Sequence, residues 1–185
     1  ILKDKSFPII IIGSGPAGIT IARKLEEKKI SSLIVEAGDY EYNEDSQAYY
    51  KSKVIGDSIT DLRDSRLRQL GGTSGLWGGW CKPIEKWNIK KWGLNFEEVS
   101  KYKDETCKIL EIKNNFKKAK LDNYFNQIEF KYSKVRFAEK YKDKIKKSKY
   151  ISLILNSQVT HLKGSNHNIK EAVISQNEKS YSLNS

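Results

Sequence analysis

Methionine is absent from the 185-residue sequence, so the chain does not begin at its own start codon, and we expect a truncated or processed segment of a longer protein. Apolar runs such as residues 7–12 are far shorter than the ~20 residues that cross a bilayer, which excludes a transmembrane helix. No secretory signal precedes that run. Cys81 and Cys107 have neither CxxC nor Cys/His spacing, so we predict no metal site and no disulfide framework. A reducing, cytoplasmic compartment is expected.

Arginine is also scarce, although the net charge is +11. Residues 113–149 hold 13 basic and 4 acidic side chains, and only one of the basic residues, Arg136, is an arginine. Proteins that bind phosphate backbones usually carry more arginine and interleaved aromatic residues. The stretch therefore favours a solvated lysine-rich face. We expect no nucleic-acid partner, and membrane association is not indicated.

The N-terminal part of the chain has the pattern of a strand, a helix and a second strand. Residues 7–12 are a nearly continuous β-branched run, which predicts a central parallel strand buried on both faces. Helical spacing continues through residues 19–26 and ends at Lys28 and Lys29, whose charges suit a helix C-terminus. Residues 31–36 form the second strand, which completes a βαβ unit.

A GxGxxG motif joins the first strand to the helix. Its residues are Gly13, Ser14, Gly15, Pro16, Ala17 and Gly18. The first glycine permits a sharp turn, the second lets a pyrophosphate approach the backbone, and the third lets the helix pack closely on the strand. The helix N-terminus offers N–H groups and partial positive charge to an anion. Proline suits the first helical position, where its missing N–H costs nothing.

An acidic residue, Glu36, ends the second strand at the place where a carboxylate accepts hydrogen bonds from an adenosine ribose. Its charge disfavours a 2′-phosphate, so NADP is not expected. Ala37 and Gly38 follow as small residues that leave room for a cofactor along the strand end. These features predict dinucleotide binding, and a structural glycine turn with a surface glutamate is the alternative.

A second glycine-rich segment, residues 68–80, packs five glycines and two tryptophans into 13 residues. Glycines allow a ligand close to the backbone, and tryptophans can wall an apolar pocket. A structural loop with core tryptophans is the alternative, and composition does not distinguish a flavin from a nicotinamide.

The remaining sequence predicts two helices and four short strands. Asn95 and Glu98 resemble a capping box that opens a helix through about Leu110. Residues 135–148 predict a strongly basic helix. Residues 151–155, 158–162, 169–175 and 181–183 predict strands, the last three in an antiparallel meander. The fold class is therefore α/β, with a parallel sheet and a small antiparallel β-meander.

The motifs GSGPAG, VEAG and RQLGGTSGLWGG, in this order, resemble the FAD-binding part of the glucose-methanol-choline (GMC) oxidoreductases, in the bacterial branch near pyranose oxidases and membrane-bound sugar dehydrogenases. The resemblance spans nearly the whole chain and implies a Rossmann-like FAD-binding fold that is incomplete. Residues 1–185 would form this domain, with 80–134 a possible insertion toward a substrate domain. The cofactor-binding residues that it implies are Gly13, Ser14, Gly15, Pro16, Ala17, Gly18, Glu36, Ala37, Gly38, Arg68, Gly71, Gly72, Thr73, Ser74, Trp77, Gly78, Gly79 and Val159.

The chain departs from the family's pattern at two places. Covalent-flavin relatives carry a histidine where this sequence has Leu76, so the resemblance implies non-covalent FAD. The family's catalytic base is a late histidine that takes a proton from the substrate hydroxyl while a hydride passes to flavin N5. This chain stops before that region, and its histidines, His161 and His167, fall in and just after a predicted strand. No catalytic residue is therefore assigned within the chain.

The favoured function is an FAD-dependent oxidoreductase that acts on a sugar or an alcohol, with the electron acceptor left open. A non-catalytic, truncated flavin-binding remnant is the main alternative. A disulfide reductase or hydroxylase would carry a CxxxxC pair or a second GxGxxG, and the sequence has neither. A basic binding protein would leave all three motifs unexplained.

Overall fold

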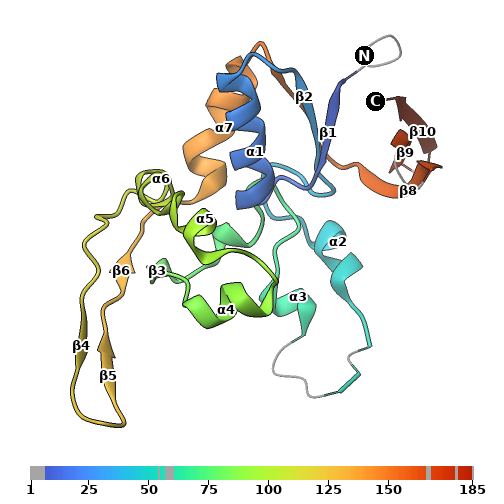
Figure 1. Cartoon of the computed structure of the whole chain (residues 1–185). Coiled ribbons are helices and arrows are strands. Elements are labelled where there is room, and N and C mark those ends of the chain that lie inside the picture. The colour runs from blue at the N-terminus through green and yellow to red at the C-terminus, as the bar shows by residue number, and fades with distance from the viewer. Residues whose placement is uncertain (1–6, 54, 57–60, 166–167, 178, 185) are drawn as a thin grey trace. The chain divides into compact units, whose positions relative to one another are not determined.

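The computed structural model describes residues 7–53, 55–56, 61–165, 168–177 and 179–184 (Figure 1). The chain divides into two compact units. The first comprises residues 1–76 and 136–185, and the second comprises residues 77–135. The bounds of the second unit lie close to those of the predicted insertion at 80–134, whose link to a substrate domain stays a prediction.

A three-stranded parallel sheet forms the centre of the first unit. Its strands are β1 (Ile9–Ile12), β2 (Ser32–Val35) and β7 (Ile151–Ile154), in the order β1-β2-β7. The prediction that the first strand is central is wrong, because β2 pairs on both sides and is buried throughout, whereas β1 lies at an edge and Ile12 is 57% exposed. A β-branched run fits either position, and the pairing partners decide between them.

Two helices cover one face of this sheet. Helix α1 (Pro16–Glu27) packs on all three strands, and α7 (Phe137–Lys147) lies beside α1 on β7 (Figure 1). Ile11 and Ile34 are register partners, and Ile11 lies close to Gly18 of α1. Side chains alternate along a strand, so Leu33 and Val35 point to the opposite face. There they form an apolar core with three residues of the C-terminal strands, Ala172, Ile174 and Leu183.

Those C-terminal strands form the predicted antiparallel meander, which the structure confirms. Its strands are β8 (Gln158–Ser165), β9 (Asn168–Gln176) and β10 (Lys179–Asn184), in the order β10-β9-β8. The register of β8 shifts after Val159 and after Lys163. His161 is exposed on β8, whereas His167 lies outside the described residues.

The segment between β2 and residue 76 folds into short helical turns joined by irregular chain. These are α2 (Glu44–Gln47), the 3-10 turn η1 (Ala48–Tyr50), α3 (Leu62–Ser65) and the 3-10 turn η2 (Gly72–Gly75). The side chains of Asn43 and Asp61 cap the N-termini of α2 and α3 by accepting backbone N–H groups. Within the described residues, these caps stabilise two of the short helices in the segment between β2 and residue 76.

The second unit consists of short elements. They are β3 (Trp80–Cys81), α4 (Lys86–Lys91), α5 (Phe96–Ser100), α6 (Lys103–Ile109), β4 (Lys118–Lys120), β5 (Asn126–Ile128) and β6 (Lys131–Tyr132). Strands β3 and β6 pair antiparallel, and so do β4 and β5. The unit is tied at its two ends by Trp77, whose Nε1 donates to the Val135 carbonyl at 2.9 Å.

The single helix expected from Asn95 to Leu110 is wrong, because the chain forms α5 and α6 instead. The N-terminal cap is confirmed, since Asn95 Oδ1 accepts the Glu98 N–H at 3.0 Å. At the end of α5, however, the Tyr102 N–H bonds the Val99 carbonyl three residues back, which tightens the last turn. Tyr102 is also 64% exposed, so no continuous apolar stripe holds a longer helix against a core.

Candidate cofactor-binding site

The GxGxxG loop has the geometry that its sequence predicts. Gly13 has a φ of +91°, in the region that favours glycine, and its N–H bonds the Val35 carbonyl at 2.8 Å. A Cβ on Gly18 would lie 2.1 Å from the Gly13 carbonyl oxygen, so only glycine allows α1 to pack this closely. Pro16 occupies the start of α1 directly after Gly15. The loop therefore turns sharply and presents the helix N-terminus at the carboxyl end of β1.

The space beside Gly15 is open. A Cβ on Gly15 would meet nothing within 4 Å in the described part of the chain. Gly15 precedes α1 with no side-chain cap, and the first turn of α1 holds no acidic residue. The uncapped N–H groups and the helix dipole therefore favour an anion at this position, which fits a pyrophosphate.

Glu36 and Ser14 lock the ends of two strands together. Glu36 is only 6% exposed, and its Oε2 accepts the Ser14 N–H at 2.8 Å and the Ser14 hydroxyl at 2.6 Å. Its Oε1 accepts the Gly38 N–H at 2.8 Å. Ser14 is fully buried, so its side chain serves this internal bond. The carboxylate is thereby fixed at the end of β2, and its two oxygens have more acceptor sites than these three hydrogen bonds use.

The second glycine-rich segment lies against the first. The Gly71 N–H donates to the Ser14 carbonyl at 3.0 Å, and a Cβ on Gly72 would lie 3.2 Å from the Gly15 Cα. Both Gly71 and Gly72 have positive φ values, +80° and +55°. The family resemblance implies that these two loops bind the same cofactor, and the structure brings the loops into contact.

Serine and threonine side chains hold this second segment in place. The Ser74 hydroxyl donates to the Gly71 carbonyl at 2.7 Å and accepts the Phe137 N–H at the start of α7 at 3.1 Å. Thr73 Oγ1 accepts the Leu67 N–H at 3.3 Å. Ser74 is buried, so its role in this structure is to fix the loop and the helix α7 to each other.

Two predicted cofactor residues make internal contacts here. A Cβ on Gly38 would lie 1.9 Å from the Arg68 carbonyl oxygen, so the small size of Gly38 lets two chain segments touch. The Arg68 guanidinium donates to Ser46 Oγ at 2.7 Å and to Gln158 Oε1 at 3.2 Å, and it stacks 4.6 Å from the Tyr49 ring centroid. Arg68 therefore fastens the segment of α2 and η1 to β8.

Val159 lies in β8 beside the end of β2. It packs on the core formed by Leu33 and Val35, and it pairs with Ile174 of β9. The preceding chain follows the end of β2, because the Ser157 N–H bonds the Glu36 carbonyl at 3.0 Å. Val159 is thus brought near the strand end that carries Glu36, which is compatible with the adenine-side position that the resemblance implies.

Three predicted cofactor residues belong to the second unit, and they are described within that unit. They are Trp77, Gly78 and Gly79. Trp77 is half-buried and Gly78 is exposed. Gly79 has a φ of +76°, and a Cβ there would lie 2.2 Å from the Ser133 carbonyl oxygen. The glycine at position 79 therefore serves the close pairing of β3 with the chain before residue 135.

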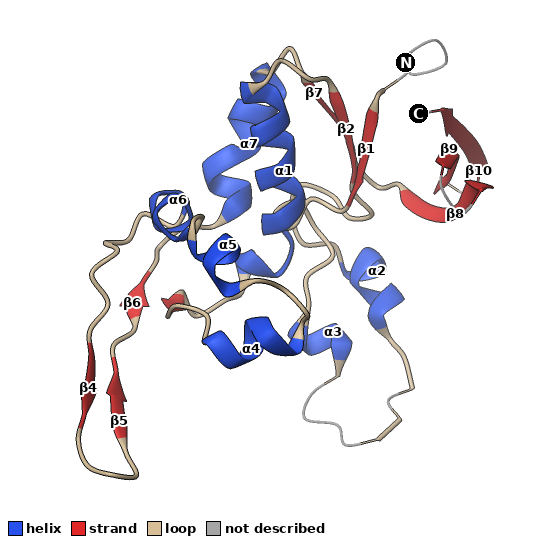
Figure 2. Ribbon diagram, viewed as in Figure 1, coloured by secondary structure: helices blue, strands red, loops and turns tan. Residues whose placement is uncertain are grey.

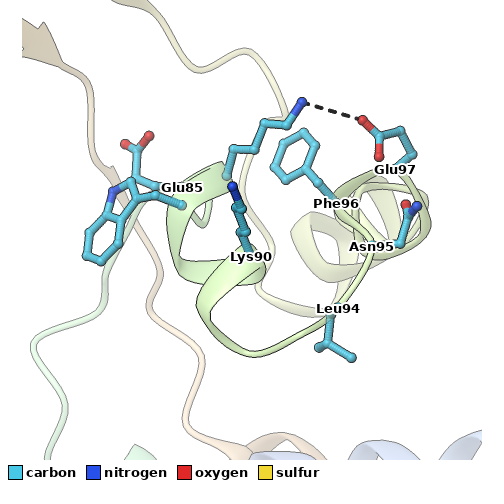
Figure 3. A pocket seen from close by; sticks show the side chains of 8 residues that line it. Glu85, Lys90, Leu94, Asn95, Phe96 and Glu97 are labelled. Atoms are coloured by element: carbon cyan, nitrogen blue, oxygen red, sulfur yellow. Dashed lines mark ion pairs between the residues drawn. The ribbon is translucent and has the colours of Figure 1, made fainter.

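A groove of about 600 Å³ lies on the second unit (Figure 3). It is lined by Glu85, Lys86, Trp87, Lys90, Leu94, Asn95, Phe96 and Glu97. The Lys86 ammonium pairs with Glu97 at 3.7 Å and lies over the Phe96 ring, so this ion pair bridges α4 and α5. None of the predicted cofactor residues lines the groove.

Asp39 connects two segments of the candidate site, a role that the sequence motifs did not predict. Its Oδ2 accepts the Asn156 side-chain N–H at 3.0 Å, and its Oδ1 accepts the Tyr40 N–H at 2.6 Å. The Asp39 carbonyl accepts the Leu70 N–H at 2.8 Å, which ties the VEAG segment to the second glycine-rich segment. Its position directly after Glu36-Ala37-Gly38 is the feature of the sequence that could have pointed to Asp39.

Asp39 is expected to give the first unit an acid response. Its pKa is lowered from 3.8, first by the Asn156 hydrogen bond, then by the Tyr40 N–H, with attraction from Lys142 a lesser cause. A carboxyl whose folded pKa is depressed stabilises the fold above its unfolded pKa, and this stability is lost as the pH falls through the folded pKa. Urea unfolding at pH 7 and below pH 3.8 should therefore show a smaller acid loss in Asp39→Asn than in the parent chain. Equal losses would contradict this role.

The described residues contain neither a metal-ligand cluster nor a membrane-spanning helix. No group of three or more His, Cys, Asp or Glu side chains there could hold a metal ion, and both cysteines are free. Across the same ranges, no helix is both long and apolar enough to pass through a bilayer.

The glycine turn, the fixed carboxylate and the parallel sheet together form the arrangement of a dinucleotide-binding α/β fold. No family model matches the chain. Glucose oxidase of Penicillium chrysogenum is 30% identical over 127 residues, which cover 55% of this chain and 20% of that protein. Pseudooxynicotine dehydrogenase of a Pseudomonas species is 27% identical over 97 residues, 52% of this chain and 16% of that protein.

The fold matches a solved structure over nearly the whole chain. Pyridoxine 4-oxidase from Mesorbium loti superposes with a TM-score of 0.61 and 15% identity, covering 97% of this chain and 48% of that one. The chain thus spans less than half the length of each of these relatives. The two sequence matches support the resemblance of the ordered motifs to the GMC oxidoreductases, and the structural match supports the fold.

Proposed function

We propose that this chain is the FAD-binding part of an oxidoreductase that acts on the CH–OH group of a sugar or an alcohol. The observation that carries the proposal is the contact between the two glycine loops, with Glu36 bound to Ser14 and Gly71 bound to Ser14 at the open side of Gly15. A relative named for the oxidation of glucose supports a sugar or alcohol substrate.

The residues of the chain fit a flavin dinucleotide. Uncapped N–H groups at the start of α1 would bind the pyrophosphate, and the absence of side chains at Gly15 and Gly72 would let it approach the backbone. Glu36 would accept a ribose hydroxyl, and Val159 would lie on the adenine side. When bound, FAD supplies the redox chemistry by accepting a hydride from the substrate carbon.

A flavin-binding protein without turnover is the second candidate, and one observation favours it. Within the described residues the sole histidine is His161, which is exposed and has its Nδ1 only 3.1 Å from Thr160 Oγ1. Among the described residues, no carboxylate or second histidine pairs with His161. Sugar-dependent or alcohol-dependent bleaching of bound FAD in the 185-residue chain would decide for catalysis over this candidate.

FAD binding is the direct test of the proposal. Titration of FAD into the 185-residue chain should quench flavin fluorescence and saturate at one equivalent, whereas NADP should not compete, because Glu36 repels a 2′-phosphate. Acid precipitation should release all of the flavin, since the proposed non-covalent site has Leu76 where covalent relatives carry histidine. Unsaturable FAD binding would defeat the proposal, and flavin that stays with the precipitate would defeat its non-covalent form.

A further inference from the structure

The β4–β5 hairpin of the second unit exposes three large apolar side chains at its tip. Leu121 is 65% exposed, Tyr124 is 88% exposed and Phe125 is 66% exposed. Every residue from 117 to 128 is exposed, and the hairpin extends away from helices α4–α6 of its own unit (Figure 2). Exposed apolar clusters of this kind mark interaction sites, because contact of apolar side chains with water is unfavourable.

The turn itself holds these side chains outward. Asp122 Oδ1 accepts the Tyr124 and Phe125 N–H groups, both at 2.7 Å, and the Leu121 N–H bonds the Phe125 carbonyl at 3.0 Å. The only acidic residue in the turn is thereby occupied by backbone donors. The tip is preformed without a core beneath it.

Cationic side chains surround the tip. Residues 113–134 contain six lysines and two carboxylates, a net charge of +4. The Glu129 carboxylate forms an ion pair with Lys131 and accepts the Lys117 N–H, and these contacts lower the pKa of Glu129. Among the described residues, Lys113, Lys117, Lys120 and Lys134 form no ion pair with an acidic side chain.

The small size of the tip favours a membrane over a protein partner. A whole large side chain offers roughly 150–250 Å², so three partly exposed ones present on the order of 500 Å². Stable protein interfaces bury about 800 Å² on each partner. Aromatic and aliphatic side chains flanked by lysines are, by contrast, the chemistry that enters the interfacial layer of an anionic bilayer.

We propose that the β4–β5 hairpin binds the surface of an anionic bilayer, with Leu121, Tyr124 and Phe125 in the interfacial layer and the surrounding lysines against the lipid phosphates. The binding is peripheral and involves no membrane-spanning segment. It does not depend on the proposed cofactor site, because every residue involved belongs to the second unit.

Vesicle co-sedimentation of the 185-residue chain tests the proposal. The chain should pellet with phosphatidylcholine–phosphatidylserine vesicles and not with phosphatidylcholine alone, and added salt should release it. Replacing Lys117, Lys118 and Lys120 by Gln should weaken binding about a hundredfold. The double substitution Tyr124→Ser and Phe125→Ser should weaken it at least about tenfold.

Matched variants separate the hairpin from the overall positive charge. The substitutions Lys144→Gln, Lys147→Gln and Lys170→Gln remove the same charge from exposed lysines of the first unit and should leave most of the binding. The substitutions Trp92→Ser and Tyr102→Ser remove comparably exposed aromatic rings of the second unit. Equal losses in the hairpin variants and these controls would overturn the proposal, as would absence of binding to any vesicle.

Fluorescence gives a second measurement, independent of yield and folding losses. The parent chain already holds four tryptophans, so the signal is the difference in emission between Tyr124→Trp and the parent chain. This difference should be that of a solvent-exposed indole in buffer and should shift to the blue when phosphatidylserine vesicles are added. A blue-shifted signal already present in buffer would show that protein covers the tip. A concentration-dependent dimer in sedimentation velocity that the Tyr124→Ser and Phe125→Ser substitutions abolish would assign the tip to a second copy. Either result overturns the membrane assignment.

Discussion

Gly15→Val is expected to abolish FAD binding while the chain stays folded. Gly15 has a φ of −65°, which any residue adopts, and a Cβ there meets nothing within 4 Å among the described residues. The chain itself therefore has room for a Cβ at this position. A bound pyrophosphate, however, would collide with the valine side chain. The loss of two charge-assisted hydrogen bonds would cost about 4 kcal/mol of binding free energy, which weakens FAD binding roughly a thousandfold.

Gly18→Ala provides the contrast that makes this result interpretable. A Cβ at Gly18 would lie 2.1 Å from the Gly13 carbonyl oxygen, so this substitution must displace α1 from β1. Thermal unfolding followed by circular dichroism should show a large fall in Tm for Gly18→Ala and a small one for Gly15→Val. Flavin fluorescence titration should then show lost binding in both. If Gly15→Val binds FAD as the parent chain does, the pyrophosphate does not lie at this loop.

The local parts of this site were predictable because their causes are local. Gly13, Pro16 and Gly18 follow from the needs of a strand that turns into a helix, and the structure confirms all three roles. The Asn95 cap depends on a bond to a residue three positions away, and it too is confirmed. Such features need only the neighbouring residues in the sequence.

The parts that depend on distant contacts were not predictable in the same way. The place of β1 at the sheet edge is decided by β7, whose residues 151–154 pair with β2 across more than 100 intervening residues. Gly38 was interpreted as room for a cofactor, whereas its missing side chain admits the Arg68 carbonyl. The break between α5 and α6 arises where exposed Tyr102 offers no apolar contact that would extend the helix.

Glu36→Gln is expected to weaken binding of adenine nucleotides that carry a 2′-hydroxyl. The buried Glu36 carboxylate already accepts the Ser14 N–H, the Ser14 hydroxyl and the Gly38 N–H, so it cannot turn away from the strand end. Glutamine keeps the shape, but it replaces one acceptor oxygen by an NH₂ donor and removes the charge. Hydrogen bonds to a charged group contribute about 1.5–3 kcal/mol each, so we expect ADP to bind roughly tenfold to a hundredfold more weakly.

Comparison of ADP with 2′-deoxy-ADP distinguishes contact with the ribose from a purely structural role. If Glu36 accepts a hydrogen bond from that hydroxyl, the parent chain prefers ADP and Glu36→Gln loses the preference, with 2′-deoxy-ADP affinity nearly unchanged. Ser14→Ala removes one donor to Glu36 and keeps the backbone N–H bond, so it should reduce the preference without abolishing it. Energetic coupling of about 0.5–3 kcal/mol between the two substitutions in a double-mutant cycle would show that Ser14 acts through Glu36. Equal losses for both nucleotides would mean that Glu36 only holds the loops together.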